Sequence, residues 1–259
     1  MSHGGDAVYV ACSTLCFSQI PLTEALQTLR EMHFQKVDLA IHEQGTQLKP
    51  SEVAIDGDRI AQQLRATNLF FSAFHVVIEA APAEATAQLT AVARLARLTT
   101  TPLICVPAAT LGSSFDDEIE RLSTWSKLVA CEGVILTVET NRHTLTADPL
   151  GAIELCRRVP GLGLTLDPSH YLVGPHRPET YDHVMKYVHH VRLRDTGASE
   201  AQFQVRIGQG QLEYGRLVSQ LQRLKYRRSL TVDIHDCPAP GFPVEPEVRK
   251  LKYLLESLV

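Results

Sequence analysis

Short apolar runs alternate with helical segments along the whole 259-residue sequence. The runs carry Val, Ile or Leu at most positions, which is typical of strands in parallel sheets, where both faces are covered. We predict eight strands, at residues 8–12, 36–40, 69–74, 103–106, 134–138, 162–166, 189–193 and 230–232. Helices are predicted after them, at residues 22–32, 51–66, 83–98, 116–130, 148–158, 181–186, 213–224 and 245–258.

Eight strands that are each followed by a helix are the signature of a (β/α)8 TIM barrel. A barrel of this kind takes about 250 residues. No Gly/Ser/Pro-rich linker or low-complexity tract divides the chain. We therefore predict an α/β fold with a single TIM barrel domain over residues 1–259. A Rossmann-type sheet is disfavoured because no Gly-x-Gly-x-x-Gly motif follows the first strand.

The charges and the apolar runs exclude several classes of partner. Lys and Arg number 25 against 29 Asp and Glu, without a basic block, so no surface for nucleic acid or an anionic membrane is indicated. The N-terminus lacks the apolar core of a signal peptide, and no apolar run reaches the ~18 residues of a membrane span. We expect a cytoplasmic protein whose six cysteines, none in a Cys-x-x-Cys pair, are buried free thiols.

Acidic residues, histidines and arginines stand at the predicted carboxyl ends of the strands. The fifth strand runs into Glu139 and the sixth into Asp167, so both carboxylates belong to the edge on which α/β barrels build active sites. Carboxylates that close on a small volume repel one another unless they share a proton or a cation, and a divalent metal is the simplest cation. The full set at the strand ends is Ser13, His42, His75, Pro107, Glu139, Asn141, His143, Asp167, His170, Arg192, Arg194, Asp233 and His235.

Five segments of the second half match motifs of a known family. They are V-E-T-N-R-H at 138–143, G-L-T-L-D-P-S-H at 163–170, H-V-R-L-R-D at 190–195, I-G-Q-G-Q-L-E-Y at 207–214 and L-K-Y-R-R-S-L-T-V-D at 224–233. Through them the chain resembles the xylose isomerase-like TIM barrel superfamily of sugar isomerases and epimerases, which is related to endonuclease IV. The first half agrees only in its alternation of strands and helices.

The resemblance implies a divalent metal ion, Mn, Mg, Co or Zn, held by acidic residues and a histidine on the last four strands. Glu139 and Asp167 match the first two ligands, and Asp233 stands where the family has a glutamate. In the epimerases the first and last acids also move the proton. This implies Glu139 and Asp233 as the catalytic pair, with the metal stabilising an enediolate. His75 and His170 match histidines that contact the substrate or the metal.

Two departures concern this metal site. The family motif His-Val-His-Leu-Lys-Asp reads H-V-R-L-R-D here, so a metal ligand is replaced by Arg192, which binds no metal and carries its own charge. Asp233 is also one methylene shorter than the usual glutamate. Three interpretations of Arg192 follow. Its guanidinium replaces the metal, or it binds an anionic group of the substrate beside a metal with fewer protein ligands, or His235 supplies the missing imidazole as a metal ligand.

Simpler interpretations apply to the remaining candidates. Asn141 is a candidate substrate contact that is also in position to cap the next helix. A clamp for a carboxylate or phosphate, formed by Arg192, Arg194 and Arg206, is one interpretation of these arginines, and surface salt bridges are the favoured one for Arg194 and Arg206. The loop at 208–210, Gly-Gln-Gly, is expected to shape the chain before the seventh helix rather than to bind phosphate, and Trp125 to anchor the core.

These observations predict an isomerase or epimerase of a sugar, sugar phosphate or keto-acid, acting by metal-assisted proton transfer through an enediolate. The expected partner is a small carbohydrate-like substrate, with Arg192 on its oxyanion or acidic group. A metal-free barrel with a binding or regulatory role, favoured by Arg192, is one alternative, and a dehydratase or lyase is another. A nuclease is disfavoured because histidines of a three-metal cluster are missing near Pro107 and before Gly208. The oligomeric state, a homo-oligomer included, stays open.

Overall fold

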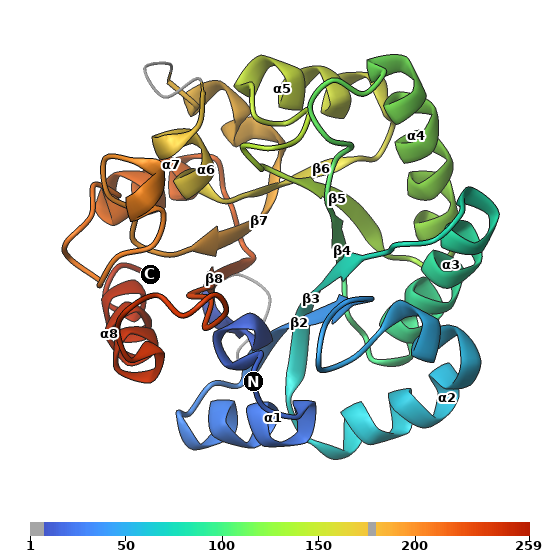
Figure 1. Cartoon of the computed structure of the whole chain (residues 1–259), viewed down its shortest axis with the longest axis horizontal. Helices are drawn as coiled ribbons and strands as arrows, with labels where there is room; N and C mark the ends of the chain where they lie inside the picture. The colour runs from blue at the N-terminus through green and yellow to red at the C-terminus, as the bar shows by residue number, and fades with distance from the viewer. Residues whose placement is uncertain (1–7, 176–179) are drawn as a thin grey trace.

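The strands close into a barrel. The computed structural model describes residues 8–175 and 180–259. Its strands are β1 (Tyr9–Ser13), β2 (Lys36–His42), β3 (Phe70–Val77), β4 (Leu103–Val106), β5 (Ile135–Glu139), β6 (Gly163–Leu166), β7 (Val188–Leu193) and β8 (Ser229–Val232). Each is parallel to its neighbours in chain order, and β8 pairs with β1. This ring (Figure 1) confirms the predicted TIM barrel.

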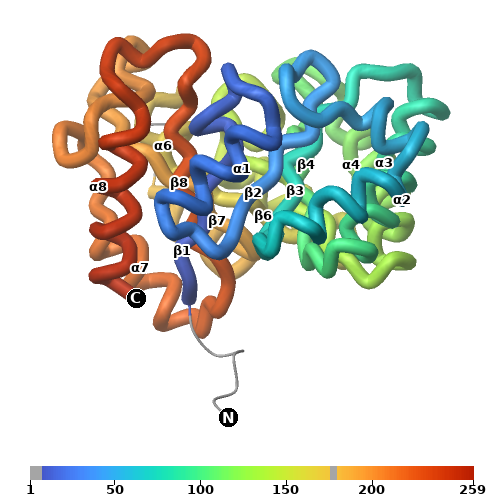
Figure 2. The backbone as a smooth tube through the Cα atoms, turned by 90° about the horizontal axis from the view of Figure 1, so that it is seen from below, coloured from blue at the N-terminus to red at the C-terminus, as the bar shows by residue number. Residues whose placement is uncertain are grey.

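The helices lie outside the ring of strands (Figure 1), and the side view in Figure 2 shows α8 and α2 on opposite sides of the strands. The α-helices are α1 (Leu22–Glu31), α2 (Pro50–Ala66), α3 (Pro82–Leu98), α4 (Phe115–Cys131), α5 (Pro149–Arg158), α6 (Pro168–Val173), α7 (Tyr214–Arg223) and α8 (Val244–Glu256), and the 3-10 helices are η1 (Thr14–Phe17), η2 (Asp182–Tyr187) and η3 (Glu200–Gln202). Caps that the sequence supplies define several starts: the Asp148 side chain accepts a hydrogen bond from Leu150 N ahead of α5. Trp125 of α4 is buried in the core, as predicted.

The register of β5 and β6 brings two acidic residues to one end of the barrel. Glu139, the last residue of β5, pairs with Thr165 of β6, and Asp167 follows Thr165 by two residues. All strands run in the same direction, so their carboxyl ends share this end of the barrel. Glu139 and Asp167 therefore lie on neighbouring strands at the edge that the sequence indicates for a site.

The segment after β6 differs from the prediction of a single helix at residues 181–186. The chain turns directly into α6, and the 3-10 helix η2 follows further on. Pro168 starts α6 at a position that needs no backbone N–H donor, and the Asp167 side chain accepts a hydrogen bond from Ser169 N as the cap. One oxygen of the Asp167 carboxylate is therefore used by the backbone.

Two other expectations concern membranes and cysteines. No helix formed by residues 8–175 and 180–259 has both the length and the apolar character needed to cross a membrane. Four of the six cysteines are buried free thiols, as expected, and the Sγ atoms of Cys12 and Cys16 lie 3.6 Å apart. The expectation was wrong for Cys131 and Cys237, which are free but exposed.

Candidate active site

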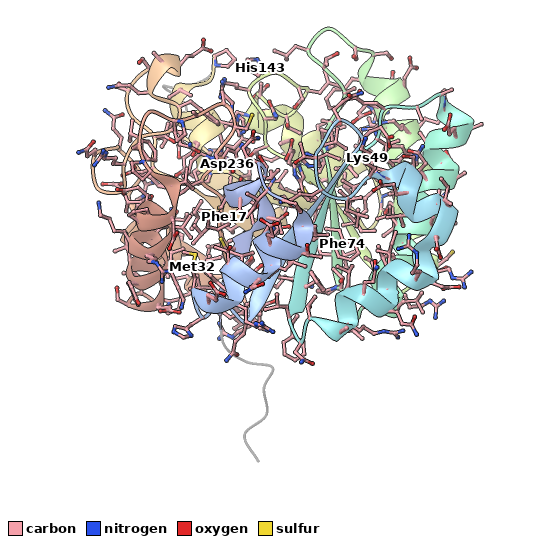
Figure 3. All side chains as sticks on the ribbon, turned by 60° about the horizontal axis from the view of Figure 1, so that its bottom comes forward. Phe17, Met32, Lys49, Phe74, His143 and Asp236 are labelled. Carbon is pink, nitrogen blue, oxygen red and sulfur yellow. The ribbon has the colours of Figure 1, made fainter. Side chains whose placement is uncertain are left out.

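The charged side chains gather at the carboxyl ends of the strands. In Figure 3, His143, which follows β5, lies at the opposite end of the molecule from Met32, which follows α1. We call the barrel end on the side of His143 the mouth. The strand-end residues that contact one another there are Ser13, His42, His75, Glu139, Asn141, Asp167, His170, Arg192, Arg194, Asp233 and His235.

Arg192 of β7 lies among three carboxylates. Its Nη2 donates to Asp233 Oδ1 at 3.0 Å and to Ser13 Oγ at 3.2 Å. Its Nε lies 3.4 Å from Asp38 Oδ2, and its Nη1 lies 3.7 Å from Glu139 Oε2. Burial alone lowers the pKa of Arg192, but the three carboxylates raise it above its ordinary value. The guanidinium therefore stays charged although it is only 3% exposed.

Arg194, two residues after Arg192 and directly after the end of β7, bridges the carboxylates that follow β6 and β8. Its Nη2 donates to Asp167 Oδ2 at 2.8 Å and to Asp233 Oδ2 at 2.6 Å. Arg194 is 2% exposed, so the expectation of a surface salt bridge was wrong for this residue, whereas Arg206 is exposed. Side chains two residues apart along an extended chain point to the same face of the sheet. The face that Arg192 and Arg194 share is the one that lines the interior of the barrel.

Both oxygens of Asp233 are engaged. Oδ1 accepts from Arg192, and Oδ2 accepts from Arg194 and lies 3.1 Å from His235 Nε2. Burial raises the pKa of Asp233, but Arg192, His235 and Arg194 together hold it well below its usual range. The carboxylate is fully buried and surrounded by donors, so it stays ionised.

Glu139 has a different kind of partner. His75 Nε2 lies 2.8 Å from Glu139 Oε2, and His75 Nδ1 lies 3.0 Å from His42 Nε2. Burial raises the pKa of Glu139, but His75 and then Arg192 hold it below its usual range, so the carboxylate is ionised and can only accept. His75 must therefore present its Nε2 proton to Glu139. The pKa of His42 is held well below its usual value by burial, with His75 and Arg192 adding to the effect.

Two further predicted site residues flank Glu139 and Asp167. Asn141 Nδ2 donates to Glu139 Oε1 at 3.4 Å, and its Oδ1 accepts from His143 N, so Asn141 orients the carboxylate while it turns the loop. His170 Nε2 lies 3.7 Å from Asp167 Oδ2. Burial lowers the pKa of His170 to about 4, which keeps its imidazole neutral near pH 7.

Sequence reasoning missed Asp38 and Phe203 as contributors to the mouth. Asp38 lies in the middle of β2, is 1% exposed, and accepts from His190 Nε2 at 2.8 Å. A lone acid inside an apolar strand was the available signal. Phe203 packs beside His170, with ring centres 4.8 Å apart, and lies 4.0 Å below the guanidinium of Arg142. Nothing in its sequence neighbourhood indicates this contact.

The Gly-Gln-Gly loop shapes the chain, as expected. The backbone N–H groups of Gly208 and Gly210 both donate to Asp195 Oδ2, at 2.7 and 3.0 Å. Gly208 has φ +87°, which favours glycine, and a Cβ at position 210 would lie 2.0 Å from Asp195 Oδ1. These amides are used inside the protein, so the loop offers no free phosphate cradle.

The side chains present do not fit a divalent ion held by Glu139, Asp167, Asp233 and His235. Within residues 8–175 and 180–259, the one group of three potential ligands with atoms within 4.8 Å of one another is His75, Cys105 and Glu139. Arg194 and Arg192 already use the carboxylate oxygens of Asp233, and Arg194 uses Asp167 Oδ2. An ion at the His75 group would lie close to the Arg192 charge and would meet a thiol whose pKa burial raises.

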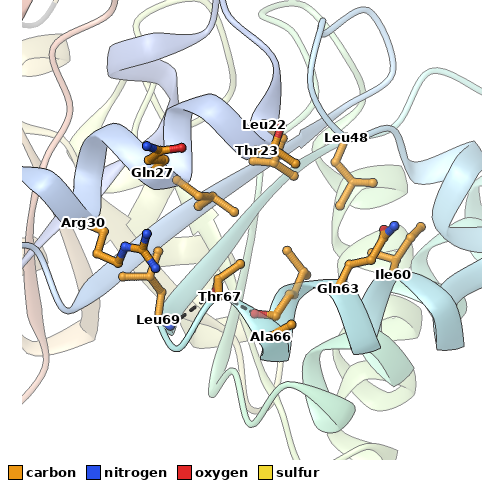
Figure 4. Close-up of a pocket in the computed structure, with 12 residues that line it drawn as sticks. Leu22, Thr23, Gln27, Arg30, Leu48, Ile60, Gln63, Ala66, Thr67 and Leu69 are labelled. Carbon is orange, nitrogen blue, oxygen red and sulfur yellow. Dashed lines mark hydrogen bonds between the residues drawn. The ribbon is translucent and has the colours of Figure 1, made fainter.

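An apolar cleft lies elsewhere on the molecule. It has a volume of about 460 Å³ and lies between α1 and α2, on the outside of the barrel (Figure 4). Its walls are mostly apolar, and the residues labelled in the figure include Leu22, Leu48 and Ile60. This cleft contains no cluster of titratable groups.

A family model described as xylose isomerase-like TIM barrel matches residues 26–256. The chain belongs to the xylose isomerase-like TIM barrel family. This confirms the resemblance drawn from the second-half motifs and extends it over most of the first half. No curated protein sequence matches this xylose isomerase-like barrel.

Solved structures of related barrels agree in fold. A D-tagatose 3-epimerase-like protein is 16% identical with a TM-score of 0.73, covering 96% of this chain and 98% of its own. A xylose isomerase-like TIM barrel protein from Mycobacterium smegmatis, solved in complex with magnesium, is 15% identical with a TM-score of 0.73 and coverages of 97% and 98%. The probable 3-DHS dehydratase AsbF of Bacillus anthracis is 16% identical with a TM-score of 0.70 and coverages of 94% and 98%. At these identities the likeness shows the fold alone.

Proposed function

We propose that this xylose isomerase-like barrel is a sugar isomerase or epimerase that moves a proton next to a carbonyl group of a small carbohydrate-like substrate. The observation that carries the proposal is the contact of Glu139 with His75 and Arg192 at the mouth. A carboxylate that takes the proton and returns it to the neighbouring carbon, beside donors for the resulting enediolate, is what isomerisation requires, and epimerisation needs in addition an acid on the opposite face of the substrate. Relatives named as sugar epimerases support the substrate class.

Glu139 is the base in this proposal. It is ionised in the free site because His75 and Arg192 lower its pKa against the effect of burial. A substrate carbonyl that accepts a hydrogen bond from Arg192 draws part of that positive charge away from the carboxylate. The pKa of Glu139 then rises, and the group becomes a stronger base once the substrate is in place.

In this proposal His75 and His42 form a route by which a proton from solvent reaches Glu139. His75 faces the carboxylate through Nε2 and shares a proton with His42 through Nδ1. His42 is partly exposed, which links the pair to solvent. Because neutral imidazole donates at one nitrogen and accepts at the other, a proton that His42 takes from solvent moves the Nε2 proton of His42 to His75 Nδ1, and the Nε2 proton of His75 then passes to Glu139. The reverse sequence returns that proton to solvent.

Arg192 stabilises the enediolate oxygen in this proposal. Its charge is fixed by its surroundings, and its Nη1 lies on the side of Glu139. A preorganised cation at a position where negative charge develops lowers the barrier without reorganisation during the reaction. Asp233, which the sequence assigned to the catalytic pair, becomes a partner of Arg192 and Arg194 here, because its oxygens are engaged by them.

The test is solvent deuterium exchange. Ketoses, aldoses, their phosphates and hydroxy-keto-acids are incubated with the protein in D2O, and incorporation next to the carbonyl is followed by proton NMR. An isomerase or epimerase exchanges that position without loss of water, whereas a dehydratase gives an unsaturated product. Exchange that persists in the Glu139→Gln variant at the wild-type rate contradicts the assignment of the base.

A further inference from the structure

The centre of the mouth holds positive charge that is covalently part of the chain. Four buried or nearly buried carboxylates, from Asp38, Glu139, Asp167 and Asp233, surround the guanidinium groups of Arg192 and Arg194. Each carboxylate has at least one arginine nitrogen within 2.6 to 3.7 Å. Unpaired carboxylates at such distances would repel one another strongly in a buried site, so these two cations are what allow them to coexist.

The surroundings of Arg192 suit a guanidinium. A guanidinium offers donors in a planar fork, so it needs acceptors on several sides. Arg192 has Asp233 and Ser13 as acceptors for Nη2, with Asp38 beside Nε. Asp38 is itself fixed by His190, whose Nδ1 contacts Ser229 Oγ at 3.0 Å. A buried chain from β8 through β7 to β2 therefore supports the guanidinium from below.

We propose that Arg192, assisted by Arg194, takes the place of a divalent metal ion in this barrel, so that the carboxylates are held together and the protein acts without a bound metal. In this proposal a single residue, Arg192, accounts for the lack of a bound metal. Replacing Arg192 by histidine removes one of the two buried guanidinium charges and supplies an imidazole on β7 beside Asp38, Glu139 and Asp233. These are ligand types that hold divalent ions. Only the activity measurement below rests on the proposed function, because metal content is measured without substrate.

The first experiment compares metal content. Wild-type protein and the Arg192→His variant are purified without affinity-tag nickel, incubated with excess Mn²⁺, freed of unbound ion and analysed by mass spectrometry of the metal. We expect less than about 0.1 ion per chain in the wild type and about one in Arg192→His. Arg157→His is the matched control, because it adds a histidine at an exposed arginine that pairs with Glu154 on α5. It should stay at the wild-type level.

A second measurement, made on the wild type, tests the proposal even if Arg192→His does not fold. The thermal unfolding midpoint of the wild type is recorded with and without millimolar Mn²⁺, Mg²⁺, Co²⁺ or Zn²⁺. A tightly bound ion stabilises the folded state, so a metal-free site predicts no upward shift. Solvent exchange on a confirmed substrate should also stay within about twofold after chelator treatment.

Two results overturn the proposal. One is a stoichiometric ion bound to the wild-type protein. Loss of that ion in Asp233→Asn would place it at the strand-end carboxylates, and its loss in Cys105→Ser would place it at the group of His75, Cys105 and Glu139. The other is a folded Arg192→His variant that binds no more metal than Arg157→His, since the carboxylates then do not form a metal site once the guanidinium is gone. Failure of the proposed function gives a separate signature, with no exchange on any substrate while the metal contents follow the expected pattern.

Discussion

The two sides of the mouth use the same kind of pairing for different purposes. On one side Glu139 meets the imidazole of His75, which in turn meets His42. On the other side Asp167 and Asp233 meet the guanidinium of Arg194. An imidazole gives up and regains a proton near neutral pH, whereas a guanidinium keeps its protons. The imidazole pair of the first side can therefore move a proton, whereas the guanidinium of the second side holds charge in place.

Glu139 and Asp233 are both ionised, so the two sides differ in the partner of the carboxylate and not in its charge. For Glu139 the main opposition to the effect of burial comes from His75, and for Asp233 it comes from Arg192. We expect substitutions on the first side to cost turnover and those on the second side to cost folding stability.

Glu139→Gln should give the largest effect. The amide keeps the size of the side chain but cannot take a proton, so we expect exchange on a confirmed substrate to fall by about 10³-fold or more. Initial rates of deuterium incorporation measure this, with Glu154→Gln on the surface of α5 as the control. A loss below about tenfold would place the base elsewhere.

Asp233→Asn should act mainly on stability. Removing the charge leaves Arg192 and Arg194 partly uncompensated in the interior, and breaking a buried pair from one side costs about 3–5 kcal/mol. The free energy of unfolding from urea titration measures it. Asp56→Asn, which affects an exposed pair with Arg59, should leave the free energy of unfolding close to that of the wild type. A stable Asp233→Asn variant that has lost exchange would return Asp233 to the catalytic pair.

The fold could be predicted because periodicity and turn residues report on local structure, and eight repeats leave few arrangements. The sequence also indicated which strand ends carry the acids. It could not predict that His75 on β3 meets Glu139 on β5, because β4 separates these strands and only the closed barrel brings them together.

The errors have physical causes as well. Arg194 was assigned to the surface because arginine is mostly exposed, and its burial depends on acids from β6 and β8. Asp38 was not among the predicted site residues because it does not stand at a strand end, although inward-facing residues within a strand also reach the interior of a barrel. The helix α6 was missed although Asp167, Pro168 and Ser169 form a recognisable helix start.

The pH dependence of folding stability tests the surroundings of His170, which lies beside Asp167 on the second side. Its pKa is lowered to about 4, first by burial. Below pH 6.5 the unfolded chain therefore binds a proton at this residue that the folded chain does not, and stability falls as the pH drops toward 4. Between pH 7 and 5 the His170 contribution is on the order of 2 kcal/mol. Urea titrations should show a flatter pH dependence for His170→Asn than for the wild type. Equal slopes would mean that His170 protonates freely in the folded state.

His42→Asn should give the smallest effect and tests whether the imidazole pair works as a relay. His42 contacts no carboxylate in the described part of the chain but faces His75 Nδ1 at 3.0 Å, so its loss leaves Glu139 in place and removes the partner that fixes the His75 tautomer. We expect kcat for exchange to fall about tenfold with KM nearly unchanged, and the pH profile of kcat to shift. The exposed His143→Asn variant is the control. A loss as large as that of Glu139→Gln would make His42 a direct participant. An unchanged pH profile would mean that His42 and His75 only pack against each other. Proton movement on this side would then depend on Glu139 and solvent alone.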